Sequence, residues 1–165
     1  MKYNSRIHHR RSIRLPHYNY AQPGLYFITI CAYQRQCLFG RVIDSQIELS
    51  SYGEIVAEEW TRSSELRQEI QLDAWVVMPN HFHGLVEIVS TDSQILRADS
   101  RDAQNLGANS RSPLRKRMKS KSISSLVSGF KSAVTYRVNC LRQTPGNPVW
   151  QRNYYEHIVR NEADR

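Results

Sequence analysis

The sequence has no long hydrophobic run and few cysteines. No stretch approaches the ~18 consecutive apolar residues of a membrane-spanning helix, and residues 1–14 are polar and basic without the apolar core of a secretory signal. The cysteines number three, and none forms a Cys-x-x-Cys pair. These absences argue against a disulfide framework and a zinc ribbon and favour a reducing compartment. We therefore expect a cytoplasmic protein that does not enter a membrane.

Acidic residues are scarce relative to basic ones. The 165 residues contain 23 Lys+Arg and 15 Asp+Glu, which gives a formal net charge of +8. This excess favours a polyanionic partner, most simply nucleic acid. The alternative is a basic protein that has no role with nucleic acid. The length is that of one domain with a proper hydrophobic core.

Two segments differ in composition from the rest of a single domain that spans residues 1–165. Residues 1–16 are basic and too polar to pack, which predicts an extended N-terminal arm. Residues 90–121 are predicted to be a flexible insertion, first rich in Ser, Asp, Asn and Gln and then basic. Two interpretations fit each of these segments: it is exposed to solvent without a specific role, or it contacts phosphate groups.

Hydrophobic periodicity predicts a mixture of strands and helices. Strands are expected at residues 25–31, 70–78 and 81–89, and residues 38–49 are expected to form short edge strands or a small hairpin. Apolar residues at i, i+4 and i+8 predict a helix over residues 52–66, with Ser51 as N-cap and Glu54 completing a capping box.

Later residues predict two further helices. One begins near Ser122 or Ser124 and ends before the Thr-Pro-Gly-Asn-Pro stretch at 144–148. Helical spacing in residues 154–165 predicts another, which has no stop signal and looks cut short. Pro79 and Asn80 predict a turn between two antiparallel strands, wider than two residues because proline does not enter a primed turn at its first central position.

The strand after this turn carries two histidines, His81 and His83. Alternate residues of a strand share a face, so the two imidazoles lie about 7 Å apart along it, at ~3.3 Å per residue, while Phe82 points the other way. A pair of neutral imidazoles leaves room for oxygen ligands and suits Mg²⁺ or Mn²⁺ acting on a phosphodiester. Such pairs also occur on surface strands without a metal. An enzyme of this kind also needs a hydroxyl nucleophile.

Several passages together resemble the REP-associated tyrosine transposases, which carry an HUH motif (histidine, bulky hydrophobic, histidine) and act on single-stranded DNA. The HUH motif corresponds to Val-Met-Pro-Asn-His-Phe-His-Gly at residues 77–84. The other matching passages lie at residues 10–15, 23–31, 37–40, 130–132 and 149–162. The resemblance covers nearly the whole chain except the region 90–120.

The resemblance implies an α+β fold, an antiparallel sheet with helices packed on it in a ferredoxin-like or RRM-like arrangement. It implies that His81 and His83 bind a divalent cation, Mg²⁺ or Mn²⁺. In that family a tyrosine attacks the scissile phosphate, giving a 5′-phosphotyrosine and a free 3′-OH, and the strand is later rejoined. The implied partner is hairpin DNA with a single-stranded flank.

The sequence departs from the family pattern at the nucleophile. The catalytic tyrosine is expected two to three turns after the match at residues 160–162, which falls beyond Arg165. Tyr136 and Tyr155 are weak substitutes. We therefore expect this chain to bind DNA, and to be poor at cleaving it. The alternative is a non-catalytic module that binds single-stranded DNA or RNA.

Basic and aromatic side chains provide candidates for the DNA contacts. Lys131 is equally typical of a side chain that extends along a helix edge, and Trp150 is as typical of a core residue as of a base-stacking one. The complete set of DNA-binding candidates is Arg10, Arg11, Arg14, Lys131, Arg137, Trp150 and Arg152.

Overall fold

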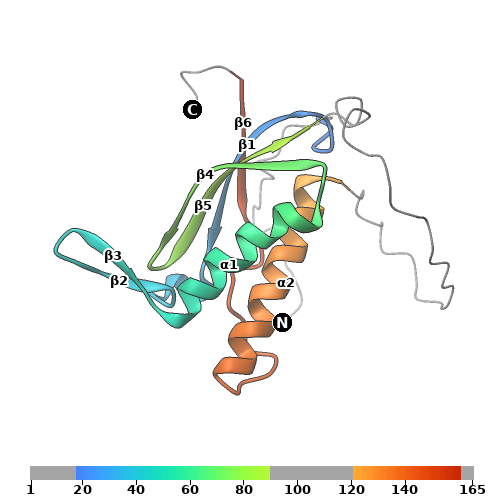
Figure 1. Cartoon of the computed structure of the whole chain (residues 1–165). Helices are drawn as coiled ribbons and strands as arrows, with labels where there is room; N and C mark the ends of the chain where they lie inside the picture. The colour runs from blue at the N-terminus through green and yellow to red at the C-terminus, as the bar shows by residue number, and fades with distance from the viewer. Residues whose placement is uncertain (1–17, 90–120, 161–165) are drawn as a thin grey trace, which may run out of the picture.

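The computed structural model describes residues 18–89 and 121–160. In these residues two helices cover one face of an antiparallel sheet (Figure 1). The strands are β1 (Gly24–Cys31), β2 (Gly40–Ile43), β3 (Gln46–Leu49), β4 (Ile70–Met78), β5 (His81–Ile88) and β6 (Tyr155–Val159). The helices are η1 (Tyr33–Arg35), α1 (Ser51–Leu66) and α2 (Ile123–Leu141). The predicted α+β class is confirmed.

The main sheet has the strand order β4-β5-β1-β6, and each neighbouring pair is antiparallel. If the separate β2–β3 hairpin is set aside, the chain runs β-α-β-β-α-β with β5 and β1 at the centre of the sheet. This is the ferredoxin-like arrangement. The hairpin extends from the body beside the start of α1 (Figure 1).

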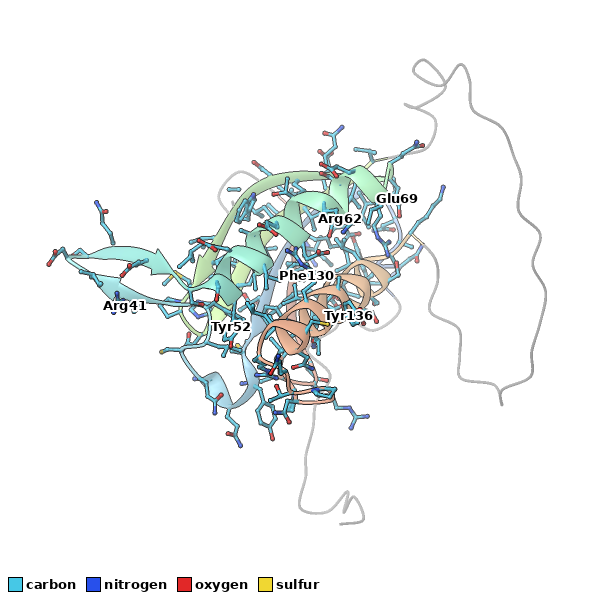
Figure 2. The ribbon with its side chains drawn as sticks, turned by 60° about the horizontal axis from the view of Figure 1, so that its bottom comes forward. Arg41, Tyr52, Arg62, Glu69, Phe130 and Tyr136 are labelled. Carbon is cyan, nitrogen blue, oxygen red and sulfur yellow. The ribbon has the colours of Figure 1, made fainter. Side chains whose placement is uncertain are left out.

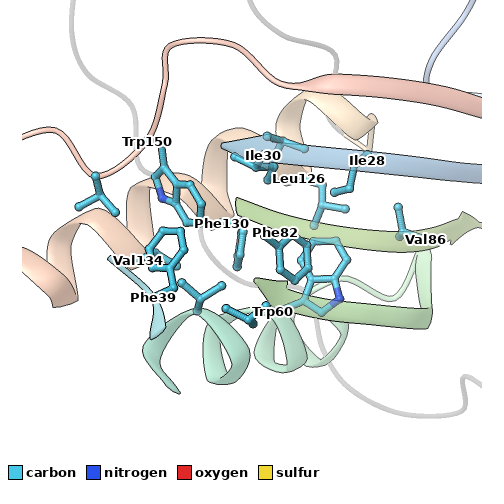
Figure 3. Packing of buried hydrophobic residues seen from close by; sticks show 14 of the residues in the cluster. Ile28, Ile30, Phe39, Trp60, Phe82, Val86, Leu126, Phe130, Val134 and Trp150 are labelled. Atoms are coloured by element: carbon cyan, nitrogen blue, oxygen red, sulfur yellow. The ribbon is translucent and has the colours of Figure 1, made fainter. Parts of the chain in front are cut away.

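The core fills the space between the sheet and the two helices (Figure 3). Strand alternation sends Ile28, Ile30, Phe82 and Val86 toward the helices. Helical residues meet them there; for example, the rings of Trp60 and Phe82 are centred 4.7 Å apart. Because the helices cover this face, the alternate residues of β1 and β5 lie on the other face of the sheet.

The connection between β4 and β5 is tighter than predicted. Met78 and His81 are register partners, so Pro79 and Asn80 form a two-residue turn, and neither has a positive φ. Contacts from outside the hairpin support this turn: the carbonyl of Pro79 accepts from Phe39 N at 2.9 Å, and the carbonyl of Asn80 accepts from Ala32 N at 2.9 Å. Tertiary hydrogen bonds therefore stabilise a turn that local preferences disfavour.

The start of α1 also differs from the prediction. Its N-cap is Ser50, whose Oγ accepts from Gly53 N at 3.2 Å and donates to the carbonyl of Leu38 at 2.8 Å. Ser51 is the first helical residue, so the capping box with Glu54 is wrong. Ser50 rather than Ser51 is the N-cap because its hydroxyl also bonds to Leu38, which connects the helix to the preceding loop.

Helix α2 begins where it was expected, with Ser122 as N-cap and Ser125 completing a capping box. Its apolar residues that face the core are buried as far as Val138, whereas Leu141 is exposed. None of the described helices combines the length and apolarity that crossing a membrane requires. Cys31, Cys37 and Cys140 are all free.

The predicted helix over residues 154–165 is wrong in its described part. Residues 155–159 form strand β6, which pairs with β1 from Thr29↔Tyr155 to Leu25↔Val159. Strand β1 lies between β5 and β6. Without β6, the backbone N–H and C=O groups on that edge of β1 would be unpaired. A short apolar run is compatible with the periodicity of a helix and with that of a strand. Here the pairing with β1 selects the strand. Residues 161–165 lie outside the described residues, as do the predicted arm and nearly all of the predicted insertion.

Candidate metal and nucleic-acid site

His81 and His83 lie on the face of the sheet opposite the helices. Both are half-buried in β5, whereas Phe82 between them is in the core. Their ring centroids are 4.5 Å apart. The prediction that the two imidazoles share one face is therefore confirmed. We call this surface of the sheet the open face.

Each imidazole is oriented through its Nδ1 atom. His81 Nδ1 lies 2.6 Å from Asn80 Oδ1, and because an amide oxygen only accepts, Nδ1 carries the proton and Nε2 keeps its lone pair. His83 Nδ1 lies 2.8 Å from Thr29 Oγ1, and the ring stacks on Phe27 with centroids 5.2 Å apart. The Nε2 atom of each ring is thus the nitrogen available to a ligand.

The surroundings keep both imidazoles in the neutral form that binds metals. Burial lowers the pKa of His81 below the ordinary 6.5, and the positive charge of Arg35 lowers it further. Burial also lowers the pKa of His83, with a smaller contribution from His81. Both rings are therefore mainly neutral at pH 7, and binding an ion would not first require the loss of a proton.

Within residues 18–89 and 121–160, no cluster of three or more His, Cys, Asp or Glu side chains is placed to hold an ion. The two imidazoles fit as a partial ligand set, whose remaining positions water or a phosphate oxygen would fill. Thr29 and Asn80 orient these imidazoles, and neither was predicted from the sequence. Asn80 could have been found, since it adjoins His81. Thr29 becomes visible only from the register of β1 against β5.

The predicted DNA contacts divide into different environments. Arg152 is exposed. Lys131 donates from Nζ to the carbonyls of Gln151 at 2.6 Å and Arg152 at 3.2 Å, and burial lowers its pKa. Arg10, Arg11 and Arg14 lie outside the described residues.

Arg137 and Trp150 have structural partners. The guanidinium of Arg137 lies 2.6 Å from Glu58 Oε2 and 2.9 Å from Oε1 of the buried Glu59, so its charge is compensated. These side chains join α1 to α2. Trp150 is only 6% exposed and packs against Phe39. Of its two predicted roles, the structure supports the core one.

A groove of about 1370 Å³ lies next to the histidine pair. It is bounded by α2, by the end of β1 and by residues 146–155. Thr29 and Cys31 line it, and these are the register partners of His83 and His81. The groove and the histidines therefore adjoin across one strand.

Comparison with known proteins gives one close relative. An uncharacterized protein of Haemophilus influenzae is 41% identical over 162 residues, which span 98% of this chain and 84% of that protein. The chain belongs to the same family as this protein. No family model matches the sequence.

The fold is that of a REP-associated tyrosine transposase. The solved structure of one such transposase, which is bound to a REP hairpin, aligns with a TM-score of 0.56 at 17% identity. The alignment covers 93% of this chain and 66% of that chain. The predicted resemblance is thus confirmed at the level of the fold.

Proposed function

We propose that this protein binds single-stranded or hairpin DNA at the open face of its sheet, with a divalent cation held by His81 and His83. The observation that carries the proposal is the pair of neutral, oriented imidazoles on the open face of a transposase fold. The net charge of +8 supports a polyanionic partner. The transposase that shares this fold was solved with a DNA hairpin.

The residues of this chain would hold the ion and orient its ligands. Each ring would keep its Nε2 lone pair when its Nδ1–H donates a hydrogen bond, to Asn80 Oδ1 in His81 and to Thr29 Oγ1 in His83, and these bonds would also keep the rings from rotating. A bound Mg²⁺ or Mn²⁺ would polarise a phosphate oxygen and offset the negative charge that develops during strand cleavage. Nitrogen donors favour Mn²⁺ over Mg²⁺, which makes Mn²⁺ the better probe.

Arg152, together with Arg10, Arg11 and Arg14, would contact the DNA backbone. We leave Arg137 and Trp150 out of the proposed interface because the first is paired with two carboxylates and the second is buried. In Lys131, two of the three N–H groups are taken by carbonyls. We therefore assign it to positioning residues 151 and 152.

The nucleophile distinguishes binding from strand cleavage. Cleavage requires a hydroxyl nucleophile close to the ion in addition to the ion itself. We propose that the residues around His81 and His83 bind and orient DNA, and we assign no residue as the nucleophile. The same site then serves as a non-catalytic module for single-stranded nucleic acid, which is the second candidate function and is supported by the exposure of Tyr155 and His157 on β6.

The test compares three fluorescein-labelled DNAs by anisotropy: a hairpin with a single-stranded flank, a single strand and a blunt duplex. We expect the first two to bind about tenfold more tightly than the duplex. Equal affinity for all three would reduce the proposal to charge attraction alone. The same mixtures with Mn²⁺, run on a denaturing gel, test catalysis, and a covalent protein–DNA adduct would contradict the non-catalytic candidate function.

A further inference from the structure

The groove beside the histidine pair is large and is lined by a second face of α2. Leu126 and Phe130 face the core, whereas Ser124, Ser128 and Thr135 line the groove. The opposite wall is the segment 146–155, which Lys131 holds against α2 through its bonds to the carbonyls of Gln151 and Arg152. Tyr136, labelled on α2 in Figure 2, is 72% exposed.

The chemistry of the lining indicates an anionic ligand. Among the described residues that line the groove, none is Asp or Glu, and the charged ones are Lys131 and Arg152. Hydroxyl groups from α2 add neutral hydrogen-bond donors. A wall with positive charge, hydroxyl donors and no carboxylate is complementary to a phosphate backbone.

Aromatic side chains indicate what else the ligand carries. Tyr155 lines the groove, is 45% exposed and is the register partner of Thr29, which in turn bonds His83. Tyr136 lines it as well. Exposed aromatic rings in a basic groove stack on unpaired bases, whereas a duplex keeps its base faces inside the stack.

We propose that the groove holds a nucleic-acid single strand that continues from the histidine pair, with Arg152 on a backbone phosphate and Tyr155 stacked on a base. The proposal rests on the proposed function, because the strand in the groove continues the one at His81 and His83. It adds a second contact region, on the side of the sheet where β6 and α2 lie. It also assigns Tyr155, which belongs to β6, as a base-contacting residue.

The test uses the full chain and a single-stranded oligodeoxynucleotide with 5-iododeoxyuridine at successive positions. Irradiation should cross-link the wild-type protein at Tyr155 or Tyr136, identified by mass spectrometry of the peptides. In anisotropy titrations, Tyr155→Leu should weaken binding about tenfold. Arg152→Gln should weaken it about threefold to tenfold and reduce the salt dependence by about one ion.

Matched controls separate the groove from the rest of the surface. Tyr33→Leu changes another exposed tyrosine, and Arg41→Gln removes a charge from the β2–β3 hairpin; neither residue lines the groove. Both controls should bind as the wild type does. Wild-type affinity in Tyr155→Leu and Arg152→Gln, with cross-links only outside the groove, would overturn this inference and the role of Arg152, whereas the proposed binding of DNA and an ion at His81 and His83 would stand. Failure of the folded wild-type protein to bind any single strand would overturn both.

Discussion

The hydroxyl of Thr29 is the contact that fixes the ring of His83, at 2.8 Å from Nδ1. Thr29→Val keeps the β-branched shape and removes the hydrogen bond. We expect the affinity for Mn²⁺ to fall about tenfold, because partners of this kind orient metal-binding histidines. Calorimetric titration with Mn²⁺ measures this. The matched control is Thr61→Val, which removes a hydroxyl that only bonds within α1; equal effects of the two substitutions would contradict the role of Thr29.

The two histidines also make stability depend on pH. Their pKa values lie below 6.5 in the folded state, so the unfolded chain binds more protons than the folded chain as the pH falls below that value. The free energy of unfolding should therefore decrease as the pH falls from 6.5 through the folded pKa values, and it should gain nothing from these groups at higher pH.

Urea denaturation at about pH 7.5 and about pH 5.5 checks this expectation, since the interval brackets the ordinary histidine pKa. The wild-type protein should lose more stability over the interval than the His81→Gln/His83→Gln variant. A variant with the same loss as the wild type would show that other groups cause the pH dependence.

At the scale of elements, α1 depends on a glycine at its first turn. A Cβ on Gly53 would lie close to the backbone carbonyl oxygen of Phe39. Gly53→Ala should therefore lower the free energy of unfolding by roughly 2 kcal/mol or more, because backbone must move. Gly129→Ala in α2 is the matched control: its Cβ would meet only the Arg67 side chain, at 3.6 Å.

In that control, alanine should stabilise the helix by about 0.5–1 kcal/mol. Thermal or urea unfolding measures both variants. Loss of stability in Gly129→Ala, or none in Gly53→Ala, would contradict the packing described for the two helices.

The elements also show what the sequence could and could not predict. The long periodic segments, α1, α2, β1, β4 and β5, were predicted within a few residues because one face of each is apolar. The strand β6 was mistaken for a helix, since five residues carry too little periodicity and pairing with β1 decided the outcome.

The same distinction applies to the site. His81 and His83 follow from strand alternation and lie together as expected. Other features depend on contacts between segments far apart in the sequence: the burial of Trp150 and Glu59, the hydrogen bond between Thr29 and His83, and the groove along α2. Such contacts leave no local pattern of residues.

For the whole molecule, the fold places the histidine pair and the basic groove next to each other across strand β1. The net charge of +8 attracts a nucleic acid over the whole surface, but the imidazoles and Tyr155 lie on one face of the sheet. If His81 and His83 hold an ion that contacts a phosphate of the DNA, the ion and the DNA should bind cooperatively. A protein that used charge alone would bind DNA independently of the ion.

The most direct measurement is the affinity of the full chain for a hairpin with a single-stranded flank, by anisotropy, in EDTA and in Mn²⁺. The wild-type protein should bind about tenfold more tightly in Mn²⁺, a typical coupling between two ligands. The folded His81→Ala/His83→Ala variant should bind equally in both conditions. An equal gain in the wild type and the variant, or no gain in the wild type, would contradict the assignment of the ion to His81 and His83.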